Sequence, residues 1–197
     1  MLFNFQKIVK KNRRPALSVA IYFLISLGIW GDKASVKVKI SWSYENISEK
    51  IELFEYNPAS QLNLWATGEK KTEKELPISK KISSSQFISA PGENYRFVLV
   101  MKNTSSEKKY FFAAPHIAQP GGYSLGFKFK CLCVNMVYNV SPGMYWYRVV
   151  ELRISPAVKS GEIDFHHQIT GLSEPESQEY MKSFYEQMNE DNRMPNM

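Results

Sequence analysis

Short segments of alternating apolar and polar residues, separated by turn signals, constrain the fold of this chain more than any other sequence feature. In the first of them, Val36, Val38, Ile40 and Trp42 alternate with polar residues. A period of two places successive side chains on opposite faces of a strand that has one buried face. Pro, Gly, Asn and Ser cluster between the segments, and this punctuation predicts an antiparallel sandwich or barrel. The other predicted strands span residues 61–65, 86–89, 95–101, 110–114, 127–134, 145–154 and 163–169.

The composition is that of a folded, aromatic-rich domain. Of the 197 residues, 44% are hydrophobic and 22% are charged, which excludes a wholly disordered chain. Twelve Phe, eleven Tyr and four Trp suit a β-rich core, where flat rings pack on pleated surfaces. Two Cys are too few for a disulfide-stabilised scaffold. Residues 68–85 are rich in Lys, Glu and Ser, and they are predicted to form a solvated loop or a ragged sheet edge.

Residues 15–31 carry no charge and form the predicted membrane anchor. Their number lies at the short end of the ~17–25 residues that span a bilayer as a helix. The basic tail 1–14 before them favours a cytoplasmic N-terminus. A cleaved signal peptide and a buried core helix are the alternatives. Because this tail supplies most of the net charge of +6, the charge is weak evidence for nucleic-acid binding, and no nucleic-acid partner is expected.

An amphipathic helix is predicted over residues 174–192, with Ser173 and Glu176 as its N-terminal capping box. The sequence therefore divides into a basic tail (1–14), a transmembrane anchor (15–31), a β-sandwich domain (33–172) and a helix with a tail (173–197). The apolar residues of the helix are Tyr180, Met181, Phe184, Tyr185 and Met188.

Cys131 and Cys133 are the strongest candidates for chemistry. They form a Cys-x-Cys pair in the strand-like segment FKFKCLCV, and residues i and i+2 of a strand face the same way. Two thiolates on one face suit a soft ion such as Cu(I), whereas a zinc site would need four ligands. The alternatives are a redox-active pair and two small hydrophobic side chains inside the sandwich. Since one strand supplies only two ligands, a full site needs further residues or a second subunit.

The three histidines, His116, His166 and His167, are predicted to have ordinary surface or turn roles. None of them stands at metal-ligand spacing from another His, Asp or Glu on a helix. His166 and His167 are neighbours on a predicted strand, so they point to opposite faces, and one of them is expected to be exposed. The sequence contains no nucleophile elbow, phosphate-binding loop or zinc-protease helix, and an enzyme is therefore not expected.

Four motifs between residues 91 and 156 follow one pattern. The turn PGE leads into a strand that ends at Asn103, Pro120 precedes the cysteine segment, and the strand FKFK runs into the Cys-x-Cys pair. The turn Pro142-Gly143 is followed at a fixed distance by Pro156. In these motifs the chain resembles the cytochrome c oxidase copper-assembly family of the CtaG type. It departs from that family at Leu132, Val134 and Met144, where the family has two aromatic residues and Glu.

The resemblance implies an immunoglobulin-like β-sandwich behind a membrane anchor, with Cys131 and Cys133 as Cu(I) ligands. The implied function is a Cu(I) chaperone that delivers copper to the copper–haem centre of a haem-copper oxidase. Its expected partners are the membrane, the oxidase subunit that carries the copper site or another membrane copper enzyme, and a second copy in a homodimer. The expected location is the inner membrane, with the sandwich in the periplasm or the mitochondrial intermembrane space. The alternative is a structural accessory subunit of a membrane complex.

Overall fold

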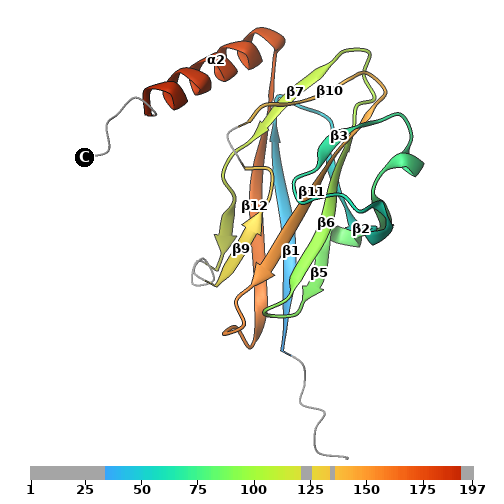
Figure 1. The fold of residues 1–197 in the computed structure, drawn as a ribbon, viewed down its shortest axis with the longest axis vertical. Helices are drawn as coiled ribbons and strands as arrows, with labels where there is room; N and C mark the ends of the chain where they lie inside the picture. Colours follow the sequence, from blue (N-terminus) through green and yellow to red (C-terminus); the bar gives the residue numbers. More distant parts are fainter. Residues whose placement is uncertain (1–33, 121–125, 134–135, 192–197) are drawn as a thin grey trace, which may run out of the picture. The chain divides into compact units, whose positions relative to one another are not determined.

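The computed structural model describes residues 34–120, 126–133 and 136–191, and these are mainly β (Figure 1). The described strands form two six-stranded sheets. Sheet A has the order β10-β7-β12-β1-β5, with β8 also paired to β12; sheet B has the order β3-β11-β6-β2-β4, with β9 also paired to β11. The strands of sheet A are β1 (Ser35–Glu45), β5 (Gln86–Ser89), β7 (Lys109–Ala113), β8 (Ile117–Gln119), β10 (Tyr138–Val140) and β12 (Ser160–Leu172). The strands of sheet B are β2 (Ile51–Tyr56), β3 (Thr67–Lys70), β4 (Ile78–Lys81), β6 (Asn94–Lys102), β9 (Phe127–Lys130) and β11 (Tyr145–Ile154).

The two-sheet arrangement confirms the predicted mainly β, sandwich-type fold, with one difference in strand direction. β1 pairs with β12 in parallel, with Val38 opposite Ile163, whereas its other neighbour β5 is antiparallel. Sheet A is therefore mixed, and the prediction of a purely antiparallel sheet was wrong. Only alternation can be read from a single strand, and alternation does not reveal the direction of its partner.

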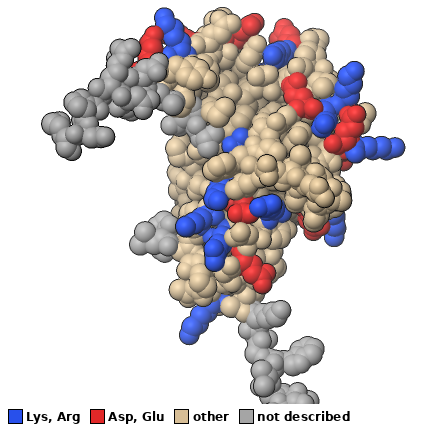
Figure 2. All heavy atoms as spheres, viewed as in Figure 1, with Lys and Arg blue, Asp and Glu red and all other residues tan. Residues whose placement is uncertain are grey.

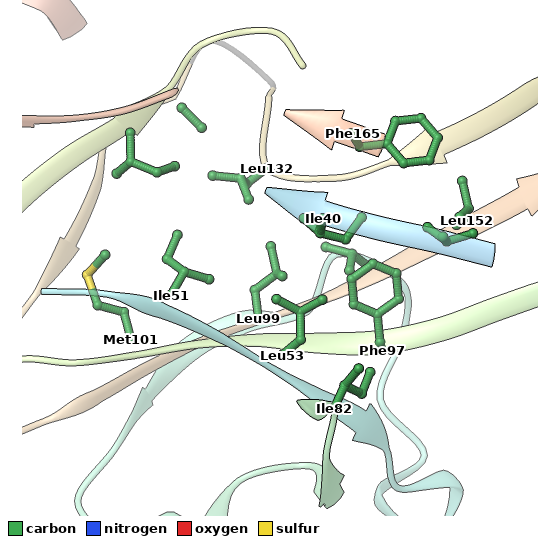
Figure 3. Close-up of a cluster of buried hydrophobic side chains, with 14 of the residues drawn as sticks. Ile40, Ile51, Leu53, Ile82, Phe97, Leu99, Met101, Leu132, Leu152 and Phe165 are labelled. Carbon is green, nitrogen blue, oxygen red and sulfur yellow. The ribbon is translucent and has the colours of Figure 1, made fainter. Parts of the chain in front are cut away.

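The main core consists of side chains that the two sheets direct toward each other (Figure 3). From β1, Val38 and Ile40 are at most 1% exposed, as their alternation with lysines predicts. Phe97 and Leu99 of β6 are fully buried in the same cluster. Leu132, the residue between the two cysteines, is also fully buried there. Burying a side chain of this size stabilises the fold by about 1.5–3 kcal/mol, so the core fixes both the sheets and the cysteine segment.

Residues 57–85 differ from the sequence prediction in two places. Leu76 is only 6% exposed and packs with Val98 and Val149 of sheet B. Residues 68–85 are therefore not one solvated loop, although their two short strands, β3 and β4, do lie at the ends of the sheet B order. Residues 61–65 form no strand, because Gln61 and Trp65 have φ angles of 52° and 66°, outside the extended region.

The predicted C-terminal helix is present as α2 (Glu174–Asp191). The capping box is confirmed: the Ser173 amide donates to Glu176 Oε2 at 2.7 Å, and the Glu176 amide donates to Ser173 Oγ at 3.4 Å. The Tyr180 ring stacks on Phe112 of β7, with centroids 5.4 Å apart, while Tyr185 is 57% exposed. Within the described part of the chain no helix is long and apolar enough to cross a membrane. The predicted anchor at 15–31 and the basic tail 1–14 lie outside the described residues.

Candidate metal site

Four potential metal ligands from three segments of the chain converge at one place. They are His116 between β7 and β8, Cys131 and Cys133 after β9, and His167 on β12. One ligand atom from each of them lies within 4.8 Å of all the others. The two Sγ atoms are 3.0 Å apart, and His116 Nδ1 lies 3.4 Å from Cys131 Sγ and 3.7 Å from Cys133 Sγ. Both cysteines are free thiols. We refer to these four residues as the His2Cys2 cluster.

The cysteines lie in a bend after β9, not within the strand that the sequence predicts over 127–134. β9 pairs with β11 only from Glu151 to Ile154. The backbone groups of Val149 on this edge of β11 are already hydrogen-bonded to another segment. Trp65 N–H donates to Val149 O, and Val149 N–H donates to Ala66 O, both at 2.9 Å. β3 then occupies Tyr145–Arg148 of β11. The chain therefore leaves the sheet at Cys131, and the thiols come together through a bend.

The bend is held from three sides. The Leu132 side chain is buried in the main core. Tyr138 Oη donates to the Leu132 carbonyl at 3.0 Å, and Arg148 Nε donates to the Cys131 carbonyl at 3.3 Å. The Cys133 amide also donates to Cys131 Sγ at 3.4 Å. These contacts fix the backbone on either side of the thiols, so the sulfur positions depend on the fold.

His167 is the most enclosed member of the cluster. It is 0% exposed, and neither of its ring nitrogens has a hydrogen-bond partner among the described residues. A buried imidazole without a partner is costly, and an ion bound by the cluster would satisfy one nitrogen. The Trp42 ring lies against it with centroids 4.8 Å apart. The prediction that His167 has an ordinary surface or turn role is therefore wrong.

His116 also departs from its predicted role, whereas His166 does not join the cluster. The partly buried His116 ring packs against Phe129 and Phe165, at centroid distances of 5.2 and 5.6 Å. His166 is partly exposed on the opposite face of β12, with its ring nitrogens 3.1 Å from the hydroxyls of Ser41 and Ser43. The expectation that His166 and His167 face opposite sides of the strand is confirmed.

The two thiols hold their protons unequally. The hydrogen bond between the two sulfurs lowers the pKa of Cys131 far below the usual thiol value; burial opposes this, and the neighbouring His116 and His167 lower the pKa further. The same hydrogen bond and burial raise the pKa of Cys133. A thiolate is the form of cysteine that binds metals, and the lowered pKa of Cys131 favours that form.

The donor set fits a soft or borderline metal ion. The two sulfurs are soft ligands and suit Cu(I), while the total of four ligands, two sulfurs and two imidazole nitrogens, also suits Zn(II). Cys131 is 5% exposed and His167 is fully buried, whereas Cys133 and His116 are partly exposed. An ion in the cluster would be held on one side by buried ligands and could be reached on the other side. Since one chain brings four ligands together, a second subunit is not needed to complete the ligand set.

Comparison with known proteins places the chain in a family without assigning an activity. Residues 36–172 match the model of a family described as a domain of unknown function, DUF8709. The matched segment contains all four residues of the His2Cys2 cluster. No curated protein matches the sequence.

Proposed function

The chain belongs to the DUF8709 family, and we propose that this member uses its His2Cys2 cluster to bind Cu(I) and deliver it to a membrane copper enzyme. The observation that carries the proposal is the uneven exposure of the four ligands. Cys131 and His167 are buried, while Cys133 and His116 are partly exposed and lie within 3.7 Å of each other. A site that only stored an ion would hold it more securely if every ligand were enclosed. A protein that hands its ion to an acceptor needs ligands that the acceptor can reach.

Delivery would proceed by ligand exchange without a change of oxidation state. A thiolate or imidazole of the acceptor forms a bond to Cu(I) as the bond to Cys133 or His116 breaks. The remaining bonds to Cys131 and His167 break when a second acceptor ligand arrives. The ion stays Cu(I) throughout, and the two sulfurs then again share a proton taken from solvent. No electron is transferred in this exchange. The pair must nevertheless be kept reduced between cycles, because only a thiolate binds the ion.

The acceptor and the location are proposed from the sequence. The CtaG-type resemblance favours the copper–haem centre of a haem-copper oxidase as the acceptor. The uncharged segment 15–31 and the basic residues before it favour a single-pass anchor in the inner membrane, with the sandwich in the periplasm or the intermembrane space. Protease added to the outer face of spheroplasts or mitoplasts should then degrade the sandwich. A sandwich that survives this treatment while a known outer-face protein is cut would exclude this topology.

A structural accessory subunit is the second candidate, and the completeness of the ligand set favours it. Four ligands from two residue types match the tetrahedral Cys2His2 sites in which Zn(II) has a purely structural role. In that case the ion would tie three segments together and would not be exchanged. The sandwich would then serve as a docking module within a membrane complex.

Metal competition on the reduced full-length protein distinguishes the two candidates. We expect one Cu(I) per chain, held against a Cu(I) chelator of known affinity, and loss of this binding in the C131S/C133S variant. Ser is a hard, protonated oxygen donor and cannot replace a soft thiolate. His167→Ala should weaken Cu(I) binding about tenfold or more, because it removes the most buried nitrogen ligand.

His166→Ala is the matched control. It removes a histidine from the adjacent position of the same strand, but from the opposite face, and it should leave the affinity unchanged. Cu(I) binding by C131S/C133S as tight as that of the parent would overturn the proposal. Tightly held Zn(II) that excess Cu(I) does not displace would favour the structural candidate.

A further inference from the structure

Arg148 places a positive charge in the interior next to the His2Cys2 cluster. The residue lies on β11 and is only 6% exposed. Its Nε donates to the carbonyl of Cys131 at 3.3 Å, and its Nη1 donates to Thr67 Oγ1 at 2.8 Å. The guanidinium carbon lies 5.4 Å from the centre of the Tyr138 ring. All three partners are uncharged, so the hydrogen bonds satisfy donors of Arg148 but do not neutralise it.

In each ion pair among the described residues the cationic side chain is at least 41% exposed. Lys37 pairs with Glu162, Lys39 with Asp164, Lys81 with Glu52, Arg96 with Glu151 and Lys182 with Glu186, and none of these carboxylates pairs with Arg148. Figure 2 shows lysines and arginines lying beside aspartates and glutamates across one face of the molecule. Arg148 differs from these residues in being buried and in having no carboxylate partner among the described residues.

A buried charge without a counter-charge is costly, and the cysteine pair is a source of negative charge beside Arg148. Arg148 is hydrogen-bonded to the backbone of Cys131 itself. The sulfurs of Cys131 and Cys133 are 3.0 Å from each other. The arginine and the thiols are therefore close enough to interact through the interior.

We propose that Arg148 makes the His2Cys2 cluster selective for a monovalent soft cation over a divalent one. The inference rests on the proposed function and adds that the site distinguishes ions by their charge. Two thiolates, two neutral imidazoles and one monovalent ion carry a net charge of −1, which Arg148 balances. The same ligands with Zn(II) are neutral, and the charge of Arg148 then remains unbalanced in the interior. Opposite charges interact strongly there, so this difference favours the monovalent ion.

The test compares the ratio of Cu(I) to Zn(II) affinity in the parent and in Arg148 variants of the reduced full-length protein. Arg148→Gln keeps a hydrogen-bond donor but removes the charge, and it should lower the ratio about tenfold or more. Arg148→Lys keeps the charge and should hold the ratio within about threefold of the parent. Arg153→Gln removes an exposed charge from the same strand and should leave the ratio unchanged. Both affinities are measured by competition with chelators of known affinity.

An unchanged ratio in Arg148→Gln would overturn the inference, and so would an equal fall in Arg148→Gln and Arg148→Lys. In the second case the guanidinium acts by its hydrogen bonds to the bend and not by its charge. Near-UV circular dichroism checks that each variant is folded; if Arg148→Gln does not fold, Arg148→Met carries the same comparison. Failure of the proposed function gives a different result, because the parent protein itself would then not hold Cu(I).

Discussion

On β12, neighbouring residues face two different environments. His167 is fully buried toward the core, whereas Asp164 and His166 lie on the other face of the sheet. There they are next to β1, the neighbouring strand. Asp164 accepts hydrogen bonds from Lys39 Nζ at 2.9 Å and from Ser41 Oγ at 2.7 Å. Burial raises the pKa of Asp164, but the hydrogen bonds from Ser41 and Lys39 outweigh it and hold the pKa below its ordinary value. The carboxylate therefore strengthens the parallel β1–β12 pair while it is ionised.

We predict that Asp164→Asn lowers the free energy of unfolding by about 1 kcal/mol at neutral pH. The sign follows from the lowered pKa: the contribution is complete above the ordinary carboxyl pKa, and it disappears as the pH falls through the lower pKa of the folded state. The difference between parent and variant should therefore close in acid. Urea unfolding at several pH values between 7 and 3 measures it.

Glu162→Gln is the matched control for Asp164. Glu162 lies on the same strand and pairs with Lys37 at 3.3 Å, but its side chain is 57% exposed. Its substitution should change the unfolding free energy little at any pH, because exposed ion pairs contribute little. A constant difference between parent and Asp164→Asn down to pH 3 would show that the carboxylate charge is not the cause.

The sequence predicted half of the candidate site. Cys131 and Cys133 are close in the chain, so their spacing alone indicated a shared face. His116 and His167 are far apart in the sequence, and only the fold brings them together. One signal for His167 was available: Ile163, Phe165 and Ile169 alternate with polar residues, and His167 falls in the apolar phase of that pattern. A histidine in that phase has to be buried, and it then needs a partner.

At the scale of secondary structure, the bend after β9 decides where the thiols lie. Its anchor is Leu132, which is fully buried and lies in the chain between the two cysteines of the cluster. Leu132→Ala should lower the free energy of unfolding by about 2–5 kcal/mol, as large-to-small core substitutions do. It should also weaken metal binding, because the bend loses the contact that fixes the sulfurs. Chemical unfolding and Cu(I) competition on the same sample measure both effects.

Leu53→Ala separates a local effect from a general one. Leu53 of β2 is 1% exposed in the same core, but it belongs to a strand that carries no ligand. We expect a comparable loss of stability with metal affinity close to that of the parent. Equal weakening of metal binding in both variants would mean that the bend depends on the whole core and not on Leu132.

Apolar patterning, more than strand length, explains which strands the sequence predicted. β12 alternates along its 13 residues, and β6 and β11 carry long apolar runs that are buried almost continuously. The four-residue β5 was predicted as well, whereas the six-residue β2 was missed. β8 and β10 have only three residues each, and such segments show no period. The early end of β9 was not predictable either, because it depends on which segment occupies the edge of β11 at Val149.

For the molecule as a whole, the His2Cys2 cluster joins the two sheets. His167 belongs to β12 of sheet A and His116 follows β7 of the same sheet, while the cysteines follow β9 of sheet B. An ion bound to all four would connect segments that the chain itself joins only through long connections. Metal binding should therefore stabilise the entire sandwich and not only a local loop, since unfolding separates the ligands.

We predict that Cu(I) raises the midpoint of thermal unfolding of the reduced protein. An ion present at 100 times its dissociation constant adds about 2.7 kcal/mol to the folded state, which corresponds to roughly 5–10 °C for a domain of this size. The shift should be absent in C131S/C133S, smaller in His167→Ala and fully retained in His166→Ala. Calorimetry under anaerobic conditions measures the four proteins side by side. An equal shift in the parent and in C131S/C133S would place the stabilising ion somewhere other than between the sheets, because the double variant lacks both sulfur ligands.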